Sequence, residues 1–273
     1  MNLPAEGSVL PGKACAHTQP CRWLVSLDFD GTLRAEQGPA IDPAFFEEMA
    51  KLRAYGVRWG INTGRTLPYL CSELLPCSPT LPDFICTCER YIYLADAGGT
   101  LQPATQHNME CESINMQLRH AFQPTLHRML QVIRTTHPEL QWELAATDPL
   151  SVEAIDSETM DALMPLLAPL TTPHITIQRA GRYLRFADAR FNKGTALAYV
   201  CRELGIDAPH LFIMGDGHND IDAFCRFKGA WCAGPANTHP EVAAWLHAHG
   251  GRVSAHSGVL SALQDWLASR VYH

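Results

Sequence analysis

Short apolar runs alternate with segments of helical periodicity in the first hundred residues. The run Leu24–Leu27 predicts a buried strand, and the apolar positions between 45 and 52 recur on one helix face. Asp42-Pro43 provides an N-cap and a proline for the first turn of that helix, and Gly56 ends it. A second strand is expected over 57–61. This strand–helix–strand order predicts an α/β fold with a doubly wound, mostly parallel sheet.

The same alternation resumes near the C-terminus, after a middle segment with a different pattern. Helical periodicity over 114–133 predicts a helix that is interrupted or kinked at Pro124. Strands are expected over 141–147, 150–155, 174–178 and 182–186, with a second helix over 160–167. Helix–strand–strand given twice without crossovers predicts a small antiparallel sheet backed by two helices. We therefore expect a discontinuous core of 21–103 and 189–273, an inserted α+β module of 104–188, and a flexible segment of 1–20.

The remaining elements of the core are short and have clear boundaries. They are a strand over 83–88, a hairpin over 91–101 that turns at Gly98-Gly99, a helix capped by Asn192 and running to Leu204, a strand over 211–214, and helices from Pro240 and near 260–267. In the inserted module, alternation places Trp142, Leu144, Ile175, Ile177, Leu184 and Phe186 on an apolar face toward the helices. The opposite face of these strands is polar.

Composition excludes several classes of partner. The chain has 273 residues, 47% of them hydrophobic and 18% charged, with a net charge of -7. An acidic balance disfavours nucleic acid or an anionic membrane as the main partner. No apolar run reaches membrane-spanning length. We expect a cytoplasmic protein, a monomer or weak homodimer, whose partner is a small molecule.

The ten cysteines suggest reduced thiols more than a disulfide framework, because a chain of this length does not need one. A zinc site made of Cys71, Cys77, Cys86 and Cys88 is a weaker alternative. No CxxC pair or CxxH companion supports it.

The strand at 24–27 ends in two carboxylates, a glycine and a hydroxyl. Asp28 and Asp30 start on the same side of an extended chain, where they can hold a hard cation and leave one oxygen free for chemistry. Gly31 allows a sharp turn and a close approach of the backbone to a ligand. The simpler alternative is a strand that runs into an ordinary Asp-Gly turn. An EF-hand is excluded, because the later acids of a calcium loop are missing.

Four segments together resemble the motifs of the haloacid dehalogenase superfamily of phosphohydrolases. They are Asp28-Phe29-Asp30-Gly31-Thr32, Asn62-Thr63-Gly64-Arg65, Asn192-Lys193-Gly194 and Gly215-Asp216-Gly217-His218-Asn219-Asp220. Each is weak alone, but their order and their places at strand ends or a helix start are those of the superfamily. About 130 residues separate Thr63 from Lys193, which leaves room for an inserted module. This spacing resembles the type II alpha-beta cap of Cof-like and sucrose-phosphatase-like sugar-phosphate phosphatases. Relatives with this cap often carry a small or glycine-containing turn where this sequence has Glu89-Arg90.

The resemblance implies a set of roles. Asp28 would be the nucleophile that forms an aspartyl-phosphate, and Asp30 the general acid and then the base. Lys193 and Mg²⁺ would offset the repulsion between a carboxylate and a phosphate dianion. The expected metal ligands are Asp28, Asp30 through its backbone carbonyl, Asp216 and, in support, Asp220. The expected phosphate-binding residues are Gly31, Thr63, Gly64, Arg65 and Asn219.

Each of these residues also has an ordinary interpretation, for instance Lys193 as a solvated charge and Asp216 as a helix cap. On the polar face of the inserted module we expect Glu153, Tyr183 and Arg185 to contact a polyol leaving group; a solvated sheet face is the alternative. The sequence thus predicts a Mg²⁺-dependent phosphatase acting on a small soluble phosphomonoester, a sugar phosphate. A sugar phosphomutase and a non-catalytic binding or regulatory protein remain as alternatives, and no Schiff-base lysine supports a phosphonate-cleaving enzyme.

Overall fold

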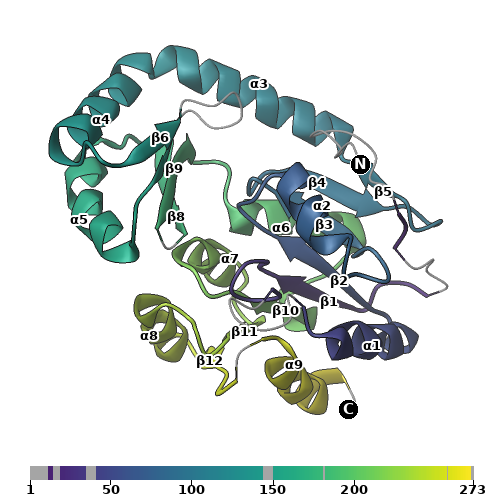
Figure 1. Ribbon diagram of the computed structural model, residues 1–273. Helices are drawn as coiled ribbons and strands as arrows, with labels where there is room; N and C mark the ends of the chain where they lie inside the picture. Colours follow the sequence, from purple (N-terminus) through teal and green to yellow (C-terminus); the bar gives the residue numbers. More distant parts are fainter. Residues whose placement is uncertain are drawn as a thin grey trace.

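An eight-stranded sheet forms the larger part of the computed structural model (Figure 1), which describes residues 12–14, 19–34, 41–143, 150–180, 182–256 and 258–271. Its strand order is β12-β11-β10-β1-β2-β3-β4-β5. The strands are β1 (Trp23–Leu27), β2 (Val57–Asn62), β3 (Phe84–Thr87), β4 (Tyr91–Ala95), β5 (Leu101–Pro103), β10 (Leu211–Met214), β11 (Trp231–Gly234) and β12 (Arg252–Val253). All pairs from β12 to β3 are parallel, and β4 and β5 are antiparallel.

Helices cover both faces of this sheet, and two separate hydrophobic clusters lie beneath them. The helices are α1 (Pro43–Leu52), α2 (Leu67–Leu74), α6 (Lys193–Leu204), α7 (Ile221–Arg226), α8 (Pro240–Ala248) and α9 (Leu260–Trp266). Asp42 caps α1 by accepting from the amide of Ala44, and Gly56 ends the following turn with φ +75. Asn192 and Thr195 form a capping box that fixes the start of α6. These caps are the ones expected from the sequence.

The order of the strands sets the location of the site. The chain builds β2 and β3 on one side of β1 and returns to build β10 on the other, with Leu24 opposite Leu211 and Leu27 opposite Met214. Ligands of such sheets bind beyond the carboxyl ends of the strands, where the order reverses. The segments after β1 and β10 therefore meet at this edge.

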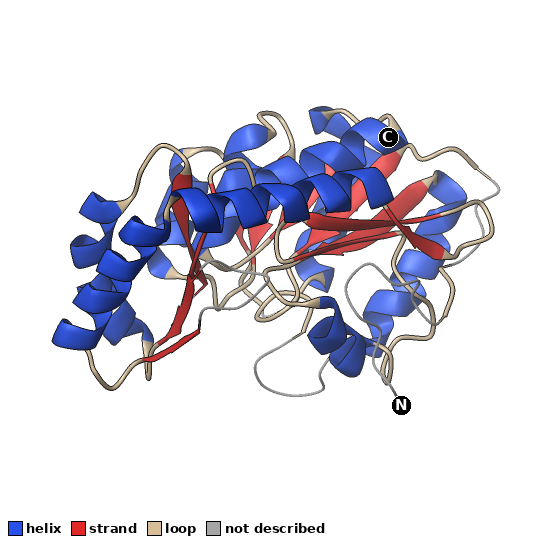
Figure 2. Cartoon of the chain, turned by 90° about the horizontal axis from the view of Figure 1, so that it is seen from above, coloured by secondary structure: helices blue, strands red, loops and turns tan. Residues whose placement is uncertain are grey.

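The second sheet is four-stranded and antiparallel, in the order β6-β7-β9-β8. Its strands are β6 (Gln141–Glu143), β7 (Leu150–Glu153), β8 (Ile175–Ala180) and β9 (Tyr183–Asp188), and α3 (Thr105–Ala121), α4 (Gln123–Thr136) and α5 (Ser157–Leu167) accompany them. A separate apolar cluster joins this sheet to its helices. Figure 2 shows the two sheets as distinct groups of strands, with the long α3 running past both. We call the unit formed by β6–β9 and α3–α5 the cap.

The predicted fold class is confirmed: a mostly parallel α/β sheet with a separate antiparallel α+β cap. The interruption expected near Pro124 is present: α3 and α4 are divided at Phe122, so the proline lies in the first turn of α4. Two details differ. Trp142 is 38% exposed on edge strand β6, with the Arg134 guanidinium 4.3 Å from its ring centroid, and does not belong to the buried face. Strand β12 was not expected.

Some expectations fall outside the described residues. The strand predicted over 141–147 is described only to Glu143, and Leu144 and the Asp148-Pro149 turn lie in the gap at 144–149. Most of the segment 1–20 is also outside the described residues. The limits 104 and 188 remain our proposal for the extent of the cap.

Candidate active site

Three carboxylates gather at the carboxyl edge of the main sheet. Asp28 follows β1, Asp216 follows β10, and Asp220 belongs to the short 3-10 helix η4 (His218–Asp220). Oxygens of the three side chains lie within 4.8 Å of one another. The parallel pairing of β1 with β10 brings these residues together although nearly 190 positions separate them in the sequence.

Lys193 is the buried cation of this cluster. Its Nζ lies 2.7 Å from Oδ1 of Asp28 and 2.6 Å from Oδ1 of Asp220, and its side chain is 1% exposed. The start of α6 holds it there, since its own carbonyl accepts a hydrogen bond of 2.9 Å from Asn62 Nδ2. The ordinary interpretation of Lys193 as a solvated charge is therefore wrong.

The charges of the cluster shift the pKa values of its members. Burial, reinforced by the charges of Asp28 and Asp220, raises the pKa of Asp216 to about 8. Burial also raises the pKa of Asp220 to about 7, although Lys193 opposes that shift. Burial alone would lower the pKa of Lys193, but Asp220 and Asp28 raise it instead, so the amine keeps its charge.

The cluster fits a hard divalent cation. Three carboxyl groups face one ammonium group, and the raised pKa values of Asp216 and Asp220 show that their ionised forms lack sufficient positive charge nearby. The donor atoms are all oxygens. Mg²⁺ and Ca²⁺ prefer oxygen ligands, whereas softer metals prefer nitrogen or sulfur. Asp28, Asp216 and Asp220 are thus the residues that would hold such an ion.

The loop after β1 is fixed against Asp216. The hydroxyl of Thr32 donates a hydrogen bond of 2.8 Å to Asp216 Oδ1, and Asn237 Nδ2 donates to the carbonyl of Gly31 at 2.8 Å. Gly31 itself has φ +79, in the region that glycine adopts without strain. A Cβ at this position would lie 2.5 Å from Oδ2 of Asp216, in the loop after β10, so the close approach of the two loops requires a glycine.

Asp30 lies in a different environment from the other acids. Its carboxylate accepts from Arg65 Nε at 2.6 Å, from Arg34 Nη1 at 3.1 Å and from the Tyr69 hydroxyl at 3.1 Å. Arg65, expected to orient phosphate oxygens, therefore contacts Asp30, with Tyr69 under its guanidinium at 4.7 Å. Thr63 is 2% exposed and lines the same cavity, and its hydroxyl accepts from the amide of Arg65.

A cavity of about 580 Å³ opens above these residues, between the main sheet and the cap. The core side includes Asp28, Asp30, Gly64, Asn219 and Asp216. Of the three cap residues expected at the site, Tyr183 and Arg185 line the cavity, whereas Glu153 pairs with Arg182 at 3.0 Å near the rim. The solvated-face alternative is thus wrong for Arg185, which is 2% exposed.

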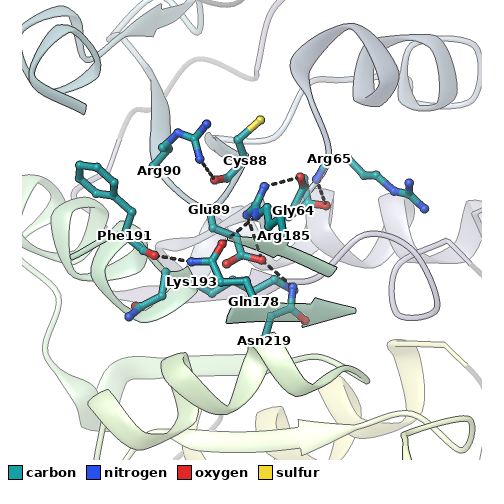
Figure 3. A network of polar contacts seen from close by, with 12 residues as sticks. Gly64, Arg65, Cys88, Glu89, Arg90, Gln178, Arg185, Phe191, Lys193 and Asn219 are labelled. Carbon is teal, nitrogen blue, oxygen red and sulfur yellow. Dashed lines mark hydrogen bonds and ion pairs between the residues drawn. The ribbon is translucent and has the colours of Figure 1, made fainter. Parts of the chain in front are cut away.

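The site residues expected from the sequence did not include Glu89, Arg179, Arg182, Tyr69 or Arg34, all of which line the cavity. Glu89 is the most consequential of these. Its Oε1 accepts from Asn219 Nδ2 at 2.7 Å and lies 3.2 Å from Nη2 of the cap residue Arg185 (Figure 3). In the sequence, the one indication that Glu89 has a role was the absence of a glycine from the turn at Glu89-Arg90.

Comparison with known families settles the classification. Residues 105–263, more than half of the chain, match the family model of haloacid dehalogenase-like hydrolases. The chain belongs to this family. The expected superfamily and fold class are confirmed by this match, as is the expectation of an enzyme.

Two curated relatives are phosphoglycolate phosphatases. The protein from Methanopyrus kandleri is 27% identical over 198 residues, which cover 72% of this chain and 78% of the relative. The one from Methanobrevibacter smithii is 42% identical, but over only 55 residues, or 20% of this chain and 23% of the relative.

Solved structures share the fold at low identity. The sucrose-phosphatase of Synechocystis, in complex with sucrose and phosphate, has a TM-score of 0.67 at 18% identity and covers 91% of this chain and 98% of its own. A haloacid dehalogenase-like hydrolase protein of Bacillus subtilis has a TM-score of 0.60 at 12% identity, covering 94% and 95%.

Two further expectations bear on the site's surroundings. Within the described residues, Cys71, Cys77, Cys86 and Cys88 form no disulfide and do not form a group close enough to share a metal ion. No helix in the described part of the chain has the length and apolar character needed to span a membrane.

Proposed function

We propose that this protein is a Mg²⁺-dependent phosphatase that hydrolyses a small phosphomonoester, a sugar phosphate, through an aspartyl-phosphate intermediate. The observation that carries the proposal is the meeting of Asp28, Lys193, Asp216 and Asp220, from separate segments, at one edge of the sheet. The phosphatases among its relatives agree with the reaction, and the sucrose and phosphate bound to the Synechocystis enzyme agree with a sugar-bearing substrate.

In this mechanism a carboxylate oxygen of Asp28 attacks phosphorus and the bond to the leaving alkoxide breaks. Asp30 donates a proton to that alkoxide, then removes one from the water that hydrolyses the acyl-phosphate. Lys193, 2.7 Å from Asp28, reduces the repulsion between the carboxylate and the phosphate dianion. Mg²⁺, held by Asp28, Asp216 and Asp220, would add charge stabilisation on the phosphoryl oxygens.

The groups around the nucleophile suit binding of the phosphoryl oxygens. Thr63 and Asn219 lie at the cavity with Gly31 and Gly64, whose backbone leaves room for a ligand. Tyr183 and Arg185 reach the same cavity from the cap, so a bound leaving group would lie between core and cap. This enclosure is the reason to propose a small substrate.

Release of phosphate from p-nitrophenyl phosphate with Mg²⁺ tests the proposal. Asp28→Asn keeps the size of the side chain but removes the nucleophile, so the rate should fall by more than about 10³-fold. Asp207→Asn, the same change at an exposed residue before β10, should leave the rate unchanged. Equal rates for the parent and Asp28→Asn would reject the mechanism.

A panel of phosphorylated metabolites then separates the alternatives. Stoichiometric release of free phosphate without a bisphosphate activator is expected for the phosphatase. A phosphomutase would instead move the phosphoryl group to a second hydroxyl of the sugar, and a binding protein would show no turnover of any member. The oligomeric state and cytoplasmic location stay predictions.

A further inference from the structure

Glu89 has a backbone conformation that side chains disfavour. It follows β3 with φ +58, and the preceding Cys88 has φ +48. Glycine would adopt this turn without strain, whereas a residue with a Cβ in this conformation lowers the stability of the folded protein. The turn is held in place by hydrogen bonds from the Glu89 amide to the Thr63 carbonyl and from the Cys88 amide to the Arg65 carbonyl. Strain of this kind, held by surrounding contacts, points to a role for the side chain.

The Glu89 carboxylate joins the core to the cap. Through Oε1 it contacts Asn219 at 2.7 Å and Arg185 at 3.2 Å, and both charged side chains are at most 3% exposed. Arg185 also donates from Nη1 to the Gly64 carbonyl at 3.1 Å and from Nε to Gln178 Oε1 at 2.7 Å. Figure 3 shows Arg185 between Gly64 and Glu89, next to Asn219. The ion pair is therefore fixed beside residues proposed to bind the phosphoryl group.

The second carboxylate oxygen has no such partner. Oε2 of Glu89 is buried and accepts no hydrogen bond from the described residues. An ionised carboxylate has about four acceptor positions, and an unused one in a buried position is unfavourable until a donor arrives. Glu89 also lines the cavity, so a ligand bound there would lie beside a carboxylate that has an unfilled acceptor position.

Because Glu89 can only accept hydrogen bonds, the ligand that contacts Oε2 must carry a donor. A hydroxyl group donates to a carboxylate and can accept from a neighbouring guanidinium, so a polyol suits the pair of Glu89 and Arg185. A carboxylate on the leaving group has no proton to donate, so it cannot fill the open acceptor position of Glu89. Glu89 therefore distinguishes leaving groups by whether they carry a hydrogen-bond donor.

We propose that Glu89 is a specificity residue, which accepts a hydrogen bond from a hydroxyl of the leaving group and selects uncharged polyhydroxy phosphomonoesters over those bearing a carboxylate. The proposal rests on the proposed phosphatase function and names its substrate class.

The test compares kcat/KM for sorbitol 6-phosphate, glucose 6-phosphate, phosphoglycolate and p-nitrophenyl phosphate. Glu89→Gln preserves an oxygen acceptor for Asn219 and Arg185 but replaces the unpaired oxygen by an NH₂ donor. We expect the parent to prefer the two polyol phosphates over phosphoglycolate, and this preference to fall at least about tenfold in Glu89→Gln. Glu203→Gln makes the same chemical change near the far end of α6 and should leave the preference intact.

An equal loss on all four substrates, or a parent that prefers phosphoglycolate, would overturn the assignment. If the thermal midpoint shows that Glu89→Gln does not fold, the double variant Glu89→Gln/Arg185→Gln removes both buried charges, and the same fall in preference is required of it. A parent inactive even on p-nitrophenyl phosphate would reject the phosphatase function itself, and the specificity role with it. Activity on that ester with an unaltered preference would reject only the role of Glu89.

Discussion

Gly31 and Gly205 offer a matched pair for testing whether the loop after β1 positions the metal-binding carboxylates. Both have positive φ, +79 and +69. A Cβ on Gly31 would lie 2.5 Å from Oδ2 of Asp216, whereas a Cβ on Gly205 would meet no atom within 4 Å. Alanine at the two positions therefore imposes the same backbone strain but only one collision.

The two substitutions should differ in stability. The left-handed conformation costs alanine about 1–2 kcal/mol at either site. Gly31→Ala adds about 1–3 kcal/mol of overpacking, so its loss of unfolding free energy should reach about 2–5 kcal/mol against about 1–2 kcal/mol for Gly205→Ala.

Activity should separate them further. Since Cβ contacts below 3.0 Å are essentially never found, Oδ2 of Asp216 must move by about half an ångström, and this displaces the carboxylate whose other oxygen, Oδ1, accepts from Thr32. A misplacement of about 1 Å in a reacting site can cost on the order of 10²-fold in rate, so about half that distance should cost about tenfold. We expect kcat to fall by about that factor in Gly31→Ala, with a higher Mg²⁺ concentration for half-maximal rate, and neither to change in Gly205→Ala.

The assay is phosphate release from p-nitrophenyl phosphate over a Mg²⁺ titration, at a temperature where circular dichroism shows both variants folded. Chemical denaturation gives the stabilities. If Gly31→Ala, folded and saturated with substrate, is as active as Gly205→Ala at every Mg²⁺ concentration, then Gly31 does not position Asp216 for the reaction.

Two further predictions concern ions and protons. Chelation by EDTA should abolish phosphate release, and added Mg²⁺ should restore it. Mg²⁺ should also raise the thermal midpoint, because a ligand at 100 times its dissociation constant stabilises the folded protein by about 2.7 kcal/mol. Asp216→Asn should lose most of that rise in the thermal midpoint. Burial lowers the pKa of His107 below its usual 6.5, so below about pH 6.5 the unfolded chain binds a proton that the folded chain resists. The parent should therefore lose more stability than His107→Gln between pH 7.5 and 5.5, as measured by urea denaturation; an equal loss would contradict this.

The sequence was sufficient to predict the core of the site because each catalytic motif is a local signal. Asp28 and Asp216 each come directly after an apolar strand, and parallel strands bring their carboxyl ends to one edge. Lys193 follows a capping asparagine, which fixes where α6 begins. Once the order of strands is known, no contact between distant side chains has to be guessed.

The details of the cap required knowledge of such contacts. Alternation along β9 correctly placed Tyr183 and Arg185 on one face, but whether that face meets water or the core depends on how the cap sits against the main sheet. Glu153 lies opposite Tyr183 in the register, yet its carboxylate pairs with Arg182 at 3.0 Å, and Glu153 is not among the described residues that line the cavity. A periodicity of two residues gives the face of a strand and not its neighbour.

Glu89 and Arg185 show why buried charges are the hardest feature to predict from a pattern. Either side chain alone would be assigned to the surface, since burying one unpaired charge costs about 3–5 kcal/mol. Together they are at most 3% exposed, and each makes the burial of the other tolerable. Their pairing crosses from the turn after β3 to a cap strand, so it exists only when the cap covers the site as it does here. The cavity and this ion pair are consequently formed by the same arrangement, so the proposed selection of the leaving group depends on the position of the cap.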